Sequence, residues 1–229
     1  MEFFLNLLRS VAYGIIEGVT EWLPISSTGH MILAEQVLKF SFSAEFMEMF
    51  RVVIQLGAIL AVVVLYFKKL WPFCADNGRD SGFSRHFRWP VVRLWCKIIV
   101  ACVPAAVLGL LLDDWLDAHL YNSITVALML IIYGIAFILI ERRPRVPTTT
   151  KLSRITYKQA LIVGAWQVLA LIPGTSRSGS TIIGGLLCGM SRPAASQFTF
   201  FLAIPVMAGA SGLKLVKFLA KGGVFTLSL

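Results

Sequence analysis

Four long apolar stretches constrain this sequence more than any other feature. They cover residues 47–67, 93–112, 121–140 and 197–216. A transmembrane helix needs about 20 predominantly apolar residues to cross roughly 30 Å of hydrocarbon. Charged residues make up only 14% of the chain, against about a quarter in soluble domains. The sequence therefore predicts an all-α polytopic membrane protein whose 229 residues form a single integral membrane domain, and it excludes a soluble enzyme and a disulfide scaffold.

The loops between these stretches alternate in charge. Two loops are basic, and the loop between them is acidic, with Asp113, Asp114 and Asp117. The basic residues are Lys68, Lys69, Arg79, Arg85, Arg88 and Arg93 in the first loop and Arg142, Arg143, Arg145, Lys151, Arg154 and Lys158 in the second. Basic loops stay in the cytoplasm, so the net charge of +9 reflects membrane orientation. We expect no nucleic-acid partner, since no basic stripe alternates with base-stacking aromatic residues.

Two further apolar segments, 3–16 and 160–172, are too short to span a membrane. Each runs into a polar turn, LPISSTGH at 23–30 or IPGTSRSG at 172–179, and then into a second short helical stretch. Polar, non-helical backbone is tolerated at membrane depth only where protein buries it or where it lines a cavity. The predicted re-entrant helix-turn-helix pairs cover residues 3–40 and 160–190.

The two pairs resemble each other in sequence. If one residue is dropped before the second proline, the matching residues are Gly14, Glu17, Pro24 and Ser27 with Gly164, Gln167, Pro173 and Ser176. Three spans separate the turns, so the second copy enters from the opposite face, as in inverted-topology repeats that form a site near the midplane. We predict a first repeat at 1–141 and a second, incomplete one at 155–229; chance similarity is the alternative.

Glu17 and Glu21 are the strongest catalytic candidates of the first pair. They are four residues apart, so a helix places both on one face. Carboxylates inside a bilayer are costly and face a polar interior. Neutralisation of basic residues is the structural alternative. No Asp or Glu follows Glu141, so any acid–base or metal chemistry must take its carboxylates from the first 141 residues.

The first turn adds hydroxyl groups and an imidazole. Ser27 is placed to cap the helix that starts there, and helix N-termini attract anions. Ser26, Thr28 and His30 lie close by in sequence, so with Glu21 the turn carries the parts of an activated nucleophile and its acid–base partner. Plain capping beside a buried neutral His30 is the structural alternative. Ser27 is our preferred attacking group, while His30 and a water molecule stay open.

The second turn supplies a positive, hydroxyl-rich complement. Arg177 has no acidic residue in its own half of the chain, so it must pair with Glu17 or Glu21 across the repeat interface or bind an anion. A guanidinium suits phosphate geometry, and hydroxyls with helix-start amides complete such a cradle. A structural Arg–Glu lock is the alternative. The predicted substrate-binding residues of both turns are Ser26, Thr28, Gly174, Thr175, Ser176, Ser178 and Thr181.

Together these parts predict a phosphate site at membrane depth, for a substrate with a polyanionic head and a hydrocarbon tail. Paired carboxylates would repel that head unless they are protonated, paired to Arg177 or bridged by a cation. We expect a hard, oxygen-ligated divalent ion such as Mg²⁺ or Ca²⁺, with Glu17 and Glu21 as its ligands.

The segment EGVTEWLPISSTGH at 17–30 resembles the glutamate-rich N-terminal motif of the BacA/UppP-type undecaprenyl pyrophosphate phosphatases. The segment PGTSRSGST at 173–181 is similar to that family's second motif, and the resemblance extends through VVIQLGAILAVVV at 52–64 over nearly the whole chain. It implies a multi-pass enzyme of the bacterial cytoplasmic (inner) membrane that removes the terminal phosphate of undecaprenyl pyrophosphate. It further implies recycling of the lipid carrier of peptidoglycan synthesis, bacitracin resistance, and a site open to the periplasm.

By motif position, the resemblance implies that Glu17 and Glu21 are the acidic pair, Ser27 and His30 the catalytic pair, and Arg177 the phosphate-binding arginine. The last two helices of the family fold are expected to be missing, as in a truncated chain or a shortened member. Phosphatases of the phosphatidic-acid type are excluded, because they need a second His and an Asp after the arginine.

The rival hypothesis is a transporter or flippase for isoprenoid phosphates, since inverted repeats with broken helices are also a transporter architecture. The oligomeric state, a homodimer included, stays open.

Overall fold

Helices make up almost all of the described part of the chain. The computed structural model describes residues 2–38, 40, 42–75, 78, 82–120, 122–142 and 146–220. Within these ranges the only β pairing is in isolated bridges, Phe73 with Phe87 and Thr149 with Met190. The predicted all-α class is confirmed.

Four helices are long and apolar enough to cross a membrane, as the four apolar stretches predicted. They are α3 (Ala44–Leu65), α5 (Trp89–Leu120), α6 (Ser123–Glu141) and α9 (Arg192–Ala220). Within α3 and α5 the apolar windows are Phe46–Leu65 and Trp89–Leu112, close to the predicted bounds. Helix α9 starts before its apolar run because Pro193 is tolerated in the first turn of a helix.

Two helical hairpins correspond to the predicted re-entrant pairs. The first consists of α1 (Glu2–Thr20) and α2 (Ser27–Leu38), and the second of α7 (Tyr157–Gln167), the short η3 (Val168–Leu171) and α8 (Arg177–Leu187). Helix α1 is longer than the apolar segment that predicted it, because the helix continues past Glu17 to Thr20. The remaining short elements are α4 (Phe67–Leu70), η1 (Gly82–His86) and η2 (Leu152–Arg154).

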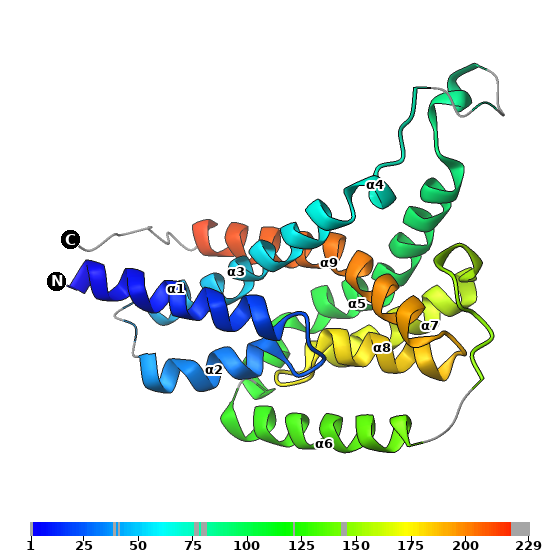
Figure 1. Cartoon of the computed structure of the whole chain (residues 1–229). Helices are drawn as coiled ribbons and strands as arrows, with labels where there is room; N and C mark the ends of the chain where they lie inside the picture. Colours follow the sequence, from blue (N-terminus) through cyan, green and yellow to red (C-terminus); the bar gives the residue numbers. More distant parts are fainter. Residues whose placement is uncertain are drawn as a thin grey trace.

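The two hairpins approach each other from opposite ends of the molecule (Figure 1). Helices α1 and α2 lie on the side of the N-terminus, α7 and α8 lie on the other side, and the two turns meet between them. The helices that follow, α3 and α9, run antiparallel along each other: Ser211 Oγ donates to the Val52 carbonyl at 3.0 Å, and Lys214 Nζ lies 2.6 Å from Glu48 Oε1. This arrangement agrees with the inverted-repeat hypothesis, while the repeat boundaries stay a prediction.

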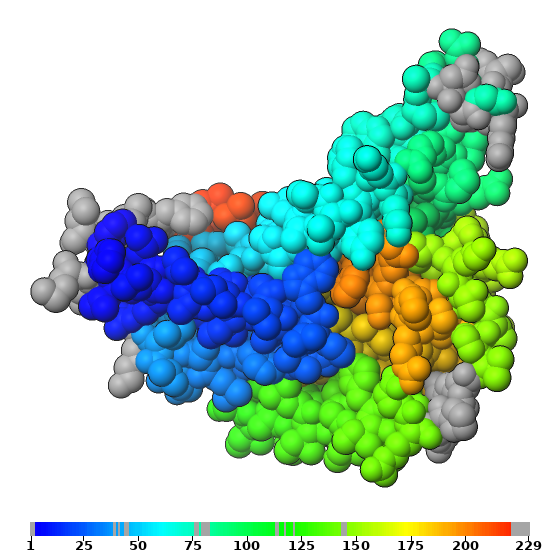
Figure 2. Space-filling view, viewed as in Figure 1, coloured from blue at the N-terminus to red at the C-terminus, as the bar shows by residue number. Residues whose placement is uncertain are grey.

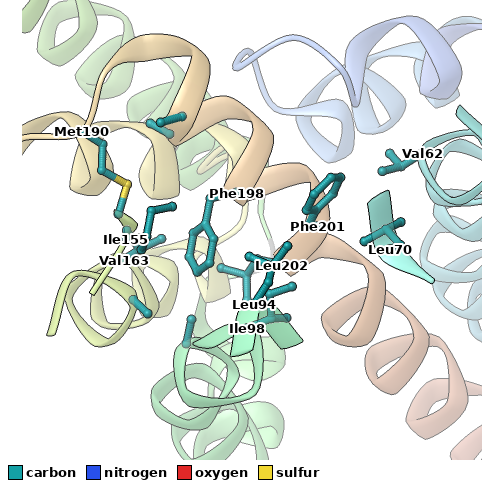
Figure 3. Packing of buried hydrophobic residues seen from close by; sticks show 14 residues of the cluster. Val62, Leu70, Leu94, Ile98, Ile155, Val163, Met190, Phe198, Phe201 and Leu202 are labelled. Atoms are coloured by element: carbon teal, nitrogen blue, oxygen red, sulfur yellow. The ribbon is translucent and has the colours of Figure 1, made fainter. Parts of the chain in front are cut away.

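The N-terminal half of α9 forms the centre of the largest hydrophobic cluster. Phe198, Phe201 and Leu202 are fully buried. Figure 3 shows them beside Leu94 and Ile98 of α5, with the second hairpin on one side and α3 on the other. Helix α9 therefore fixes the position of the second hairpin relative to the spans.

Helix α7 lies against α5 at a very close approach. A Cβ atom at Gly164 would lie 2.2 Å from the carbonyl oxygen of Ala101, a distance that real Cβ atoms do not reach. Only glycine therefore permits this helix contact. The neighbouring side chains of Ala160 and Val163 are buried in the same interface.

The segment between α3 and α5 projects from the helical body, in cyan and green at the upper right of Figure 2. The bridge between Phe73 and Phe87 closes it, and Arg88 Nη1 donates to the Lys68 carbonyl at 2.5 Å. Several residues of the predicted loop-charge pattern lie outside the described residues, namely Arg79, Arg143, Arg145 and the side chains of Asp113, Asp114 and Asp117.

Candidate active site

The turn of the first hairpin is held by Ser26. Its φ of 65° places it in the left-handed region, which is uncommon for a residue other than glycine. Its Oγ accepts from the Gly29 amide at 3.2 Å, which makes Ser26 the N-cap of α2. The prediction that Ser27 caps this helix was wrong, because the left-handed turn carries the cap one residue earlier. Ser27 Oγ instead donates to Glu21 Oε2 at 2.5 Å.

The turn of the second hairpin uses a glycine for its left-handed residue. Gly174 has a φ of 87°, and a Cβ there would lie 2.6 Å from the Val126 backbone of α6. Ser176 is the N-cap of α8 and accepts from the Gly179 amide at 3.0 Å. Gly174 therefore shapes the turn through its backbone and its contact with α6.

The two caps correct the alignment of the hairpins. Ser26 corresponds to Ser176, and Gly29 corresponds to Gly179, each 150 positions later. The same offset of 150 relates Glu17 to Gln167 without a dropped residue. Of the residues aligned here, only the prolines depart from it, because Pro24 and Pro173 are 149 positions apart. Ser27 and Arg177 then occupy equivalent positions, each the first residue of its helix.

The tips of the hairpins are joined by an ion pair between Arg177 and Glu21. Their side chains are 11% and 9% exposed. Arg177 Nη1 also donates to the Thr199 carbonyl at 3.3 Å, and Ser178 Oγ donates to the Leu23 carbonyl at 3.3 Å. Of the two acidic partners that the sequence left open for Arg177, the structure selects Glu21.

Glu17 lies one helical turn before Glu21 and is 1% exposed. Glu21, Ser27 and Arg177 are the polar groups near its carboxyl group. Neither of its carboxylate oxygens has a hydrogen-bond partner among the described residues. A buried ionised group without a partner is costly, so this carboxylate requires a proton, a cation or water.

A cavity of about 730 Å³ opens between the two tips and the spans. Eight of the predicted site residues line it: Glu21, Ser26, Ser27, Thr28, Thr175, Ser176, Arg177 and Ser178. Apolar residues of α5 and α9 form much of the remaining wall, with Ala105, Leu110 and Met207 among them. Helix α3 adds Glu48, Arg51, Val52 and Gln55, and α9 adds Lys214. One cavity thus combines a polar end with hydrocarbon-like walls.

Four predicted site residues do not line this cavity: Glu17, His30, Gly174 and Thr181. His30 Nδ1 donates to the Ser26 carbonyl at 2.8 Å, which leaves Nε2 as its remaining ring nitrogen. Thr181 Oγ1 donates to the Arg177 carbonyl at 2.9 Å and accepts from Thr199 at the same distance. His30 and Thr181 therefore contact the backbone of residues that line the cavity.

Two glutamines that line the cavity, Gln55 and Gln167, were among the lining residues absent from the predicted site. Gln55 Nε2 of α3 donates to Thr28 Oγ1 at 3.3 Å, so it positions the hydroxyl of the first turn. Gln167, at the end of α7, lines the cavity with a 2% exposed side chain. The sequence signal for Gln167 was its alignment with Glu17, which was used only as an argument for the repeat.

Glu17 and Glu21 offer the oxygen donors that a hard divalent cation takes, and of the two only Glu21 lines the cavity. No cluster of three or more His, Cys, Asp or Glu side chains occurs among the described residues. Mg²⁺ commonly uses one or two carboxylates and completes its shell with substrate phosphates and water. The unpartnered oxygens of Glu17 and the adjacent Glu21 match that donor set.

Fold and cavity together define a class: a polytopic membrane protein whose two opposed helical hairpins bring carboxylates, hydroxyls and a guanidinium to one pocket. Within that class, the chain belongs to the family described as "Bacitracin resistance protein BacA", whose model matches residues 10–228.

Several curated relatives carry the name undecaprenyl-diphosphatase. One from Enterococcus faecalis is 60% identical over 97% of this chain and 79% of its own length. One from Streptococcus gordonii is 56% identical over 96% of this chain and 77% of its own length. One from Lactococcus lactis is 53% identical, over 97% of this chain and 80% of its own length.

The Glu21–Arg177 pair predicts strong energetic coupling between the hairpins. Glu21→Gln or Arg177→Met alone leaves an uncompensated buried charge, so each should lower the free energy of unfolding by about 3–5 kcal/mol. The double variant should lose clearly less than the sum of the two, because neither charge then remains. Denaturant unfolding of the wild type and the three variants in one detergent measures this difference. If the double variant lost the full sum of the two single losses of unfolding free energy, the predicted coupling between Glu21 and Arg177 would be contradicted.

Proposed function

We propose that this chain is a membrane phosphatase that hydrolyses undecaprenyl diphosphate to undecaprenyl phosphate and inorganic phosphate. The observation that carries the proposal is the contact of Glu21 with both Ser27 and Arg177. It joins a hydroxyl, a carboxylate and a guanidinium in the lining of one cavity. The names of the family and of its curated relatives support this substrate and reaction.

Ser27 is our proposed nucleophile. Its hydroxyl already donates to Glu21 Oε2, so Glu21 is placed to accept the proton as Oγ attacks the terminal phosphorus. The bond from that phosphorus to the bridging oxygen breaks, and undecaprenyl phosphate leaves. Water then attacks the phosphorus of the phosphoserine while Glu21 again accepts a proton. The bond from that phosphorus to Ser27 Oγ breaks, inorganic phosphate is released, and Glu21 returns this proton to Ser27 Oγ. The first proton passes to the leaving phosphate or to solvent.

Arg177 would stabilise the negative charge on the transferring phosphoryl group. Its guanidinium faces the same carboxylate as Ser27, and the hydroxyls of Ser176 and Ser178 lie within 3.1 Å of each other at the start of α8. Phosphoryl transfer depends mainly on such positioning and electrostatic stabilisation. His30 stays a second catalytic candidate. We favour Ser27 because Ser27 lines the cavity and His30 does not, and because His30 Nδ1 is already bonded to the Ser26 carbonyl.

The substrate's polyprenyl tail suits the apolar walls that α5 and α9 give the cavity. A transporter would use similar walls, yet the curated relatives bear the name of a hydrolase, which favours the enzyme. We place the chain in the bacterial cytoplasmic membrane, where a role in lipid-carrier recycling and bacitracin resistance follows from the proposed reaction. A homodimer stays a prediction.

We also propose a divalent cation, Mg²⁺ or Ca²⁺, at Glu17 and Glu21. When bound it would neutralise negative charge on the substrate's phosphates. The two carboxylates could then lie beside a polyanion without repelling it, and the unpartnered oxygens of Glu17 would gain a partner.

Phosphate release in detergent micelles tests the proposed reaction, because micelles have no compartments and a pure transporter releases none. The wild type should release phosphate from undecaprenyl diphosphate, and Glu21→Gln should lower the rate by roughly 10²–10⁴-fold through loss of the base. Glu141→Gln, which removes a carboxylate at the far end of α6, should retain the wild-type rate. A wild type that releases no phosphate would refute the proposal.

Rapid-quench trapping with substrate labelled in the terminal phosphate identifies the nucleophile. The label should appear on Ser27 and should be lost in Ser27→Ala, since no other group in our scheme forms a covalent bond. Labelled His30 would overturn the serine assignment.

Removal of divalent ions by a chelator should abolish phosphate release, and added Mg²⁺ or Ca²⁺ should restore it. Glu17→Gln should need a roughly tenfold or higher cation concentration for half-maximal activity, because one ligand charge is lost. Glu141→Gln again serves as the control. Full phosphate release in excess chelator would contradict the proposed requirement for a divalent cation.

A further inference from the structure

Gln167 is a buried amide at the end of α7 that the proposed reaction does not use. The residue is 2% exposed and is one of those that line the cavity. Neither Oε1 nor Nε2 has a hydrogen-bond partner among the described residues. Buried side-chain polar atoms nearly always have a partner, so an amide left in this state points to a group that occupies the cavity.

Two further residues of the cavity lining indicate the chemistry of that group. Thr175 and Arg177 also line this cavity, and the atoms Thr175 Oγ1 and Arg177 Nε are buried and likewise have no partner among the described residues. All three can donate a hydrogen bond, and the guanidinium adds a positive charge. Donors and a cation in the lining of one cavity suit the oxygens of a phosphate or diphosphate.

The repeat explains why position 167 carries an amide. Gln167 is the counterpart of Glu17, and both side chains are buried without a partner among the described residues. Glu17 and Glu21 already place two carboxylates near Arg177. A third carboxylate at position 167 would repel a polyanion, whereas a carboxamide has the same shape and offers N–H donors.

We propose that Gln167 is a substrate-binding residue that donates Nε2–H to a phosphoryl oxygen of the diphosphate head. This inference rests on the proposed function, because it assigns the residue to the same substrate. The second hairpin then holds the head through Gln167, Thr175 and Arg177, while the first hairpin presents Ser27 and Glu21.

Two variants of Gln167 separate binding from a structural role. Gln167→Met keeps the volume and removes the donor, and should raise KM roughly ten- to hundredfold, as expected for a lost hydrogen bond to a charged group, with a smaller effect on kcat. Gln167→Glu keeps the shape but adds a charge, and should weaken binding further. Gln36→Met, at an exposed glutamine of α2, is the matched control and should change neither constant.

A second measurement is independent of turnover. A prenyl methylenediphosphonate, in which CH₂ replaces the bridging oxygen, should raise the midpoint of thermal unfolding of the wild type and of Gln36→Met. The analogue should raise the unfolding midpoint of Gln167→Met much less, and that of Gln167→Glu least. If the wild type binds this analogue but releases no phosphate from undecaprenyl diphosphate, the proposed reaction fails while the binding role stands.

The inference is overturned if both Gln167 variants bind the analogue as tightly as the wild type, even where their unfolding midpoints fall. That result would mean that internal water satisfies the amide and that its role is structural. Equal or tighter binding by Gln167→Glu would also overturn it, because an added carboxylate cannot donate to a phosphate.

Discussion

The buried contact between Glu21 and Arg177 is the interaction on which the rest of the site depends. Each charge alone would be costly at membrane depth, and an ion pair offsets that cost only where further hydrogen bonds complete it. Ser27 supplies one to Glu21, and the Thr199 carbonyl supplies one to Arg177. Separation of the hairpins would leave both charges uncompensated. The ion pair therefore holds the two turns together and keeps these polar groups at one end of the cavity.

The two turns place equivalent residues at the start of the following helix, although their left-handed residues lie at different positions of the turn. Each ends in a serine that caps the following helix, and each has one left-handed residue, which is Ser26 in the first turn and Gly174 in the second. The first residue after each cap is Ser27 or Arg177. A hydroxyl and a guanidinium therefore stand at equivalent positions on two opposed helix N-termini, whose positive dipole ends both favour an anion.

The sequence predicted the spans and both hairpins, since apolar length and polar turns depend on local composition. It also limited the partner of Arg177 to Glu17, Glu21 or a bound anion, because no acidic residue follows Glu141. It could not choose between them, and it assigned the cap to Ser27, because adjacent serines have equal capping propensity and only the backbone conformation distinguishes them. The sequence did not predict Gln167 as a site residue, because a neutral amide in a helix gives no functional signal until its burial and missing partners are seen in the structure.

The conformation of Ser26 restricts what the first turn tolerates. The residue must adopt a left-handed backbone and also offer an oxygen to the Gly29 amide. Glycine would relieve the backbone but remove the cap, and threonine would cap but resist the backbone because its Cβ is branched. Asparagine and aspartate satisfy both demands, and aspartate would bring another negative charge beside Glu21. The turn is thus open to very few amino acids, for reasons of shape as much as of chemistry.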